Sequence, residues 1–187
     1  NGIDGYIWLD VNDEPLPFKD HATIQEWMRS ATVLSREKVG RGIAGVERLE
    51  LEHEGIQFHA AFRHVDITVR KSAPQGIEQP RKKYRDAAIF ESAAYALSVL
   101  LGIDRVPRVV VRSVDGQLGT VQIWMVGIRA EVVLIQGDQL HQPDVLMWKQ
   151  LKQIMYVFDN LVANSERKQG NLLIDRSWNI WLIDHTR

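Results

Sequence analysis

Apolar and polar residues alternate along much of the segment from residue 33 to residue 69, and a period of two predicts β-structure. Residues 56 to 63 give the clearest strand, preceded by a strand over residues 46 to 52 and a turn at Glu54-Gly55. Two further strands, 106 to 112 and 120 to 127, are expected around a turn at Asp115-Gly116. The predicted faces of the clearest strand are Ile56, Phe58, Ala60 and Phe62 on one side, and Gln57, His59, Ala61 and Arg63 on the other.

Apolar residues spaced three and four apart predict helices over residues 21 to 30, 84 to 101 and 144 to 162. Residues 70 to 85, rich in Lys, Arg, Pro and Gln, are expected to form a solvated linker, and residues 132 to 135 one more strand. Strands and helices in this arrangement predict an α+β fold. The apolar stripe expected for the second helix holds Phe90, Ala93, Ala94, Leu97, Leu100 and Leu101.

The C-terminal part of the chain has an apolar helix end, a polar loop and two short apolar strands, which together predict a helix, a loop and a hairpin. If the hairpin turns midway between Ser177 and Trp178, Asn171 faces Asp184 across the strands. Cross-strand partners lie about 5 Å apart. An amide oxygen and a carboxylate at that separation can share one Mg²⁺, whose remaining ligands are commonly phosphate oxygens. The arrangement suggests phosphoryl transfer.

Composition limits the classes of partner. The chain has 187 residues, of which 45% are hydrophobic and 25% charged, and a formal net charge of -1, so nothing favours nucleic acid as a partner. Cysteine is absent, which removes disulfides and thiolate metal sites. No apolar run approaches the roughly 20 residues of a membrane span. The compartment stays open, with the cytoplasm favoured.

The C-terminal sequence resembles atypical kinases, the branch that holds phosphatidylinositol kinases, actin-fragmin kinase, bacterial persistence-toxin kinases and secretory-pathway kinases. Those families share Asn-x-Asp-Arg, then Asn, a strand, a turn and a strand that ends in a metal-binding Asp. Here the pattern is Asn164-Ser165-Glu166-Arg167, then Asn171, then Leu182-Ile183-Asp184. The resemblance implies Asn171 and Asp184 as Mg²⁺ ligands and Glu166 as the base. Glu166 departs from the pattern, because the family carries Asp there.

The resemblance assigns roles upstream as well. A loop with Gly40, Gly42 and Gly45 would cover the phosphates of ATP, although such a loop is also common without a ligand. In kinases the third strand carries a small residue and, two positions later, a Lys that reaches the phosphates; Ala61 and Arg63 have this spacing.

Arg63 can bind phosphate through its planar guanidinium, or it can be an ordinary cation on a sheet. Glu91, at the border of the apolar stripe, is the expected ion-pair partner of Arg63; the alternative is a local pair on the helix surface.

The resemblance implies a protein kinase-like two-lobed fold, with an antiparallel-sheet small lobe and a short or truncated helical large lobe. The expected parts are an N-terminal extension (1–30), a small lobe (31–126) and a partial large lobe (127–187). Kinase domains usually continue with several helices after the metal-binding Asp. We therefore expect either a fragment or an unusually reduced large lobe.

The implied function is ATP- and Mg²⁺-dependent transfer of a γ-phosphoryl group to a hydroxyl acceptor on a protein, lipid or small molecule. A pseudokinase that binds nucleotide or partners is the main alternative, and a structural domain without a nucleotide site is a third. The substitutions Arg63 and Glu166 favour the pseudokinase.

Overall fold

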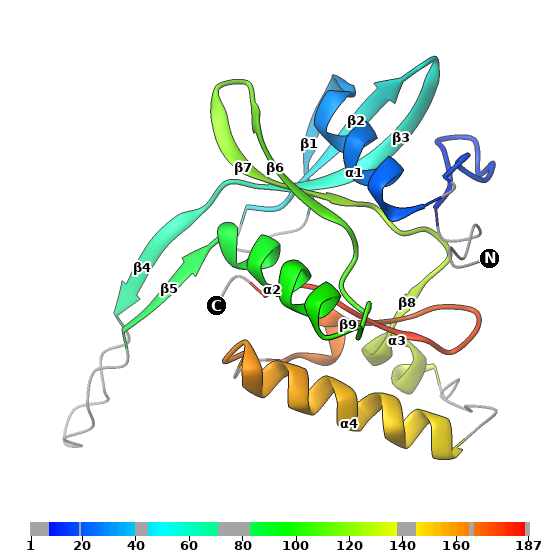
Figure 1. Cartoon of the computed structure of the whole chain (residues 1–187), viewed down its shortest axis with the longest axis vertical. Helices are drawn as coiled ribbons and strands as arrows, with labels where there is room; N and C mark the ends of the chain where they lie inside the picture. Colours follow the sequence, from blue (N-terminus) through cyan, green and yellow to red (C-terminus); the bar gives the residue numbers. More distant parts are fainter. Residues whose placement is uncertain are drawn as a thin grey trace.

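The computed structural model describes residues 8–18, 20–39, 45–70, 83–137, 145–164 and 167–185. Within them the chain has a mixed α+β architecture with a five-stranded antiparallel sheet, which confirms the predicted fold class (Figure 1). Three candidate site residues, Gly40, Gly42 and Glu166, lie outside the described residues. In the described part, no helix is both long enough and apolar enough to cross a membrane.

The main sheet has the strand order β1-β2-β3-β7-β6, with every neighbouring pair antiparallel. The alternation predicted for β3 is confirmed, since Phe58, Ala60 and Phe62 are fully buried. The hairpin between β6 and β7 turns at Asp115 and Gly116, which both have positive φ, as the tightest two-residue turns require. The strands are β1 (Thr32–Lys38), β2 (Glu47–His53), β3 (Ile56–Arg63), β6 (Val109–Val114) and β7 (Gln117–Ile123).

The helix α1 (His21–Ser30) covers one face of this sheet. Its first turn is capped by Asp20, whose carboxylate accepts a hydrogen bond from the backbone N–H of Thr23 at 2.8 Å. As the apolar spacing predicted, the buried side chains of α1 are Ile24, Trp27 and Met28.

The connection to the second helix differs from the prediction. Residues 83 to 85 belong to β5 (Lys83–Ala87), which pairs with β4 (Asp66–Arg70) in a ribbon that extends away from the body of the molecule (Figure 1). The helix α2 (Ile89–Leu100) therefore begins at Ile89 and not near residue 84. Pairing with β4, which is 13 or more residues earlier in the sequence, overrides the local helical spacing.

The buried face of α2 also differs from the predicted stripe. The buried side chains are Glu91, Ala94 and Ser98, whereas Leu100 is 81% exposed. The carboxylate of Glu91 thus lies on the buried face in the first turn of α2, because partners elsewhere in the chain satisfy it.

A second, three-stranded sheet has the order β10-β9-β8. The strand predicted over residues 132 to 135 is wrong: only Arg129–Ala130 is extended (β8), and a short helix α3 (Glu131–Gln136) follows, with Glu131 and Leu134 buried at helical spacing. The long helix α4 leads to a 3₁₀ turn and the predicted hairpin. Their bounds are α4 (Val145–Leu161), η2 (Gln169–Asn171), β9 (Leu172–Ile174) and β10 (Ile180–Leu182).

The hairpin β9–β10 lies between two hydrophobic cores. Leu173 and Trp181 pack against the core formed by the main sheet and α1, and Trp181 contacts Trp8 edge-on at 5.8 Å between ring centroids. Leu172 and Leu182 face the other core, which includes side chains of α2, α3 and α4. Because successive strand residues point to opposite faces, a short hairpin can join both cores.

Candidate functional site

Arg63 lies at the end of β3, on the sheet face opposite the α1 core, where only 8% of the residue is exposed. Its Nη1 donates a hydrogen bond to Oδ1 of Asp184 at 2.7 Å. Its Nε lies 3.9 Å from Oε1 of Glu91, so the structure brings the predicted ion pair together. The guanidinium therefore connects the sheet, α2 and the end of the hairpin.

Glu91 is buried in the first turn of α2 and has a second partner that the sequence did not reveal. Its Oε1 accepts a hydrogen bond from the backbone N–H of His185 at 2.8 Å, and its Oε2 lies 3.1 Å from Nδ1 of the same residue. Burial alone would raise the pKa of Glu91, but the hydrogen bonds from His185 and the charge of Arg63 lower it to about 2. Glu91 is therefore a buried carboxylate that stays ionised.

Asn171 and Asp184 meet at the open end of the hairpin, but the predicted register was wrong by one residue. Leu172 pairs with Leu182, so the backbone of Asn171 faces Ile183, whose N–H donates to the carbonyl of Asn171 at 3.3 Å. Asp184 has φ of +66°, so the chain leaves the strand direction there. Its Oδ2 accepts a hydrogen bond from Nδ2 of Asn171 at 2.7 Å.

Arg167 holds the loop before the hairpin. Its Nε and Nη2 donate to the buried carboxylate of Asp159 on α4, at 3.0 Å and 2.7 Å. Its Nη1 donates to the backbone carbonyls of Asn171 at 3.0 Å and Ile183 at 2.6 Å. One guanidinium thus fixes both strands of the hairpin to α4, using the planar set of donors that only arginine has.

The contact between Arg167 and His185 assigns the histidine tautomer. Nη2 of Arg167 lies 2.9 Å from Nε2 of His185. Because a guanidinium can only donate, Nε2 accepts, and the ring proton is on Nδ1, where it is donated to Glu91. His185 therefore connects the Arg167–Asp159 pair to the Glu91–Arg63 pair, and it keeps Asp184, its neighbour in sequence, at the junction.

Sequence reasoning missed Asp159 and His185 as members of this network, and it gave Asn164 and Arg167 only as positions of the kinase-like pattern. Asp159 is 6% exposed and accepts a hydrogen bond from Nδ2 of Asn164 at 3.3 Å. The available signal was a carboxylate directly after Phe158, on the buried face of a helix, since such a group needs a partner. For His185 the sequence offered no comparable signal.

The other predicted residues are placed as follows. Ala61 lies on the same face of β3 as Arg63, opposite Arg48 of β2 and Gln122 of β7. Gly45 has φ of +52°, and a Cβ there would lie 3.5 Å from the side chain of Val65. Gly40, Gly42 and Glu166 lie outside the described residues, so the phosphate loop and the base stay predictions.

Asn171 and Asp184 carry the types of oxygen that Mg²⁺ uses in proteins when phosphates supply its other ligands. Asp184 is 33% exposed on its side chain, and its carboxylate accepts hydrogen bonds from Arg63 and Asn171. Asn171 uses its amide nitrogen, and not its amide oxygen, in this contact. Mg²⁺ commonly uses one or two protein oxygens together with waters and substrate phosphates. In the described part of the chain, no group of three or more His, Cys, Asp or Glu side chains could hold a metal by itself.

Comparison of the sequence with models of known protein families and with curated proteins returned no match. The chemistry of the site therefore carries the functional argument.

Proposed function

We propose that this chain is an ATP- and Mg²⁺-dependent phosphotransferase with a kinase-like, two-lobed fold. The observation that carries the proposal is that four side chains from different elements meet at one place. They are Arg63 of β3, Glu91 of α2, Asn171 of η2 and Asp184 just after β10. Protein kinases combine the same chemical types: a cation on a sheet strand paired with a helix Glu, and an Asn and an Asp that hold Mg²⁺.

Each residue has a defined task in this proposal. Arg63 binds phosphate oxygens of ATP, and Glu91, ionised and held by His185, keeps the guanidinium in position. Asn171 and Asp184 supply the oxygens for Mg²⁺. A bound Mg²⁺ would neutralise charge on the phosphates during transfer. Glu166 is the proposed base toward a hydroxyl on a protein, lipid or small molecule.

Nucleotide binding at this site would have to break the Arg63–Asp184 ion pair. Asp184 uses Oδ1 for Arg63 and Oδ2 for Asn171. Phosphate would compete with Asp184 for the guanidinium, and this exchange would release the carboxylate toward the cation. Arginine makes the exchange possible because its several N–H donors can contact a carboxylate and a phosphate in turn.

Thermal unfolding with and without Mg·ATP tests the proposal. Ligand at about 100 times its dissociation constant should stabilise the fold by about 2.7 kcal/mol, or roughly 5 to 10 °C for a domain of this size. Asp184→Asn should abolish the Mg²⁺-dependent part of the shift, because a neutral amide binds a divalent cation poorly. Asp115→Asn, at the exposed β6–β7 turn, is the matched control and should keep the full shift.

An unchanged melting temperature of the wild-type protein in millimolar Mg·ATP would contradict the proposal. Failure of Asp184→Asn to fold would instead make Asp184 a structural residue.

A pseudokinase is the second candidate, and the same ion pair favours it. A direct Arg63–Asp184 contact at 2.7 Å holds the metal ligand against a cation of the protein itself. A site of this kind can bind nucleotide without turning it over, or act through partners alone. Stabilisation by ATP that is equal with Mg²⁺ and with EDTA, together with no turnover, would support the pseudokinase.

A further inference from the structure

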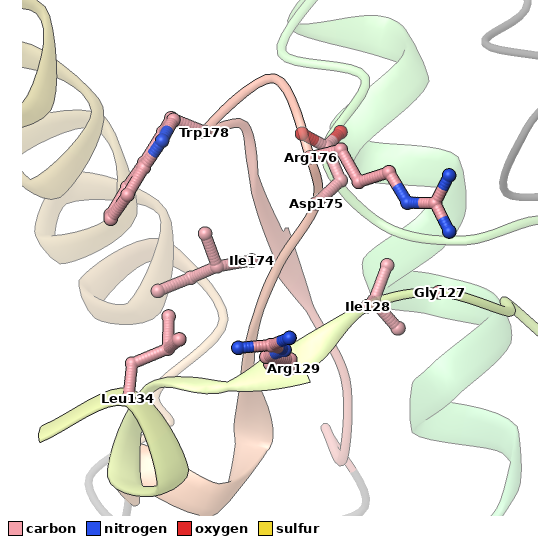
Figure 2. Close-up of a pocket in the computed structure, with 8 residues that line it drawn as sticks. All are labelled: Gly127, Ile128, Arg129, Leu134, Ile174, Asp175, Arg176 and Trp178. Atoms are coloured by element: carbon pink, nitrogen blue, oxygen red, sulfur yellow. The ribbon is translucent and has the colours of Figure 1, made fainter. Parts of the chain in front are cut away.

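A cavity of about 350 Å³ lies at the turn of the β9–β10 hairpin, at the opposite end from Asn171 and Asp184. Its walls come from β8, α3 and the hairpin, and they combine four apolar side chains with two arginines. Figure 2 shows Trp178, Ile174 and Leu134 along one wall, Arg129 between Leu134 and Ile128, and Arg176 on the far side with Ile128 and Gly127. The volume is within the range of small-molecule sites, roughly 300 to 1,000 Å³.

The wall residue Trp178 is held in an unfavourable backbone conformation. Its φ is +63°, a region in which a bulky side chain is a true outlier. The turn is fixed by the buried carboxylate of Asp175, which accepts hydrogen bonds from the N–H groups of Ser177 at 2.8 Å and Asn179 at 2.9 Å, and from Nε1 of Trp181 at 2.9 Å. Residues that the surrounding structure holds in a strained backbone conformation cluster at active sites and ligand sites.

The opposite side of the cavity is positively charged. Arg176 is exposed and has no hydrogen bond or ion pair to any group in the described part of the chain. Its guanidinium packs over Gly127, where an added Cβ would lie 3.5 Å from Nη2. Asp175 is the acidic residue of the lining, and its carboxylate is already used inside the turn. The cavity therefore offers a cation next to an apolar wall.

We propose that this cavity binds a small organic anion. Its flat apolar body would lie against Trp178, Ile174 and Leu134, and its carboxylate or phosphate would accept hydrogen bonds from the fork of donors on Arg176. The site is separate from the Asn171–Asp184 pair, because strands of this length, at about 3.3 Å per residue, keep the two hairpin ends about 10 Å apart. The proposal does not depend on the phosphotransferase function.

Isothermal titration of the full chain with 1-naphthyl phosphate, 1-naphthoate and uncharged 1-naphthol tests the proposal. One molecule of an anion should bind per chain, and naphthol should bind about tenfold more weakly or worse. Arg176→Gln should weaken the binding of both anions by a similar factor, to the affinity of naphthol. Arg29→Gln, an exposed arginine on α1, is the matched control and should leave binding unchanged. Whichever anion binds more tightly identifies phosphate esters or carboxylates as the class.

Trp178→Gly provides an independent variant, because glycine adopts a positive φ without strain. The melting temperature should stay within a few degrees of the wild-type value while affinity for the anions falls. The proposal is overturned if neither anion shows saturable binding, or if Arg176→Gln and Trp178→Gly both bind like the wild type. Competitive displacement of the anions by Mg·ATP would also overturn it, since the cavity would then belong to the nucleotide site.

Discussion

Glu91 shows how a single buried carboxylate can link the candidate site to stability. Its side chain is 1% exposed and is surrounded by donors from His185 and by the charge of Arg63. Desolvation opposes the ionised form, and the donors outweigh it, which is why the pKa falls from 4.5 to about 2. The folded state therefore holds this carboxylate ionised under conditions in which the unfolded chain protonates it.

This difference in pKa predicts an acid-dependent loss of stability. Because the folded pKa is depressed, the contribution is fully present above the unfolded pKa near 4.5 and is lost as the pH falls toward 2. Its size is about 3 kcal/mol. Glu91→Gln should be less stable than the wild type at pH 7, and the difference should shrink between pH 5 and pH 3. Urea unfolding of both proteins across this range measures the effect.

The control for acid sensitivity in general is Glu37→Gln, at an exposed pair with Arg48 on β1 and β2. Exposed pairs contribute about 0 to 1 kcal/mol, so this variant should track the wild type at every pH. A difference between wild type and Glu91→Gln that stays constant from pH 7 to pH 3 would show that Glu91 stabilises by packing and not by its charge.

The junction of α4 with the hairpin depends on Arg167. Its guanidinium contacts Asp159, the carbonyls of Asn171 and Ile183, and His185. A buried ion pair of this kind is destabilising to break, because the remaining carboxylate is left without its partner. The hairpin ends that carry Asn171 and Asp184 are positioned through these contacts.

Arg167→Lys should therefore destabilise the fold although it keeps the charge. A lysine ammonium is a compact donor and cannot reach Asp159 and two carbonyls at once, so we expect a loss of about 2 kcal/mol. Arg48→Lys, at the exposed pair with Glu37, should change stability by less than about 1 kcal/mol. Denaturant midpoints of both variants give the comparison. Equal midpoints for Arg167→Lys and the wild type would mean that the guanidinium contacts contribute nothing net.

The elements also show what the sequence could and could not predict. The strand β3, the helix α1 and the final hairpin were predicted because their apolar spacing matches their own period. The start of α2 was wrong because β5 forms only by pairing with β4. The strand expected at residues 132 to 135 was wrong because a short apolar run fits a strand or a buried helix equally well, and here Glu131 and Leu134 are buried at helical spacing. Non-local contacts decided both cases.

The same distinction applies to the candidate site. Asn171 and Asp184 were paired from the expected hairpin geometry, and Arg63 and Glu91 from the family resemblance; the structure brings all four together. Asp159 and His185 were missed because their partners lie on other segments. The register error arose because the hairpin turn is centred on Ser177 and not midway between Ser177 and Trp178. Residue spacing predicts neighbours within an element better than contacts between elements.

At the scale of the whole molecule, the site lies where two hydrophobic cores meet. Arg63 belongs to the sheet of one core, Glu91 to a helix that contributes to the other, and the hairpin packs against both. A nucleotide bound there would contact residues from elements of both cores, so its binding should stabilise the molecule as a unit. Whether bound nucleotide is also turned over depends on the loop between Asn164 and Asn171, which carries Glu166.

Glu166 has one more methylene than the Asp at this position of the kinase pattern that the sequence resembles. Misplacing a catalytic group by about 1 Å can cost roughly a hundredfold in rate. Phosphoryl transfer relies more on positioning and charge neutralisation than on deprotonation, so slow turnover is expected. Glu166→Gln should reduce the rate about tenfold or more, because the amide cannot accept the acceptor's proton, while Glu166→Asp should keep or raise it.

The measurement is ATP turnover of the three proteins, with Mg·ATP binding followed in parallel by thermal shift. The binding data separate a loss of ATP turnover from a loss of nucleotide binding, since Glu166 is not among the residues that hold nucleotide in this proposal. Turnover of Glu166→Gln at the wild-type rate would exclude Glu166 as the base. If all three proteins bind Mg·ATP and none turns it over, the molecule is a pseudokinase.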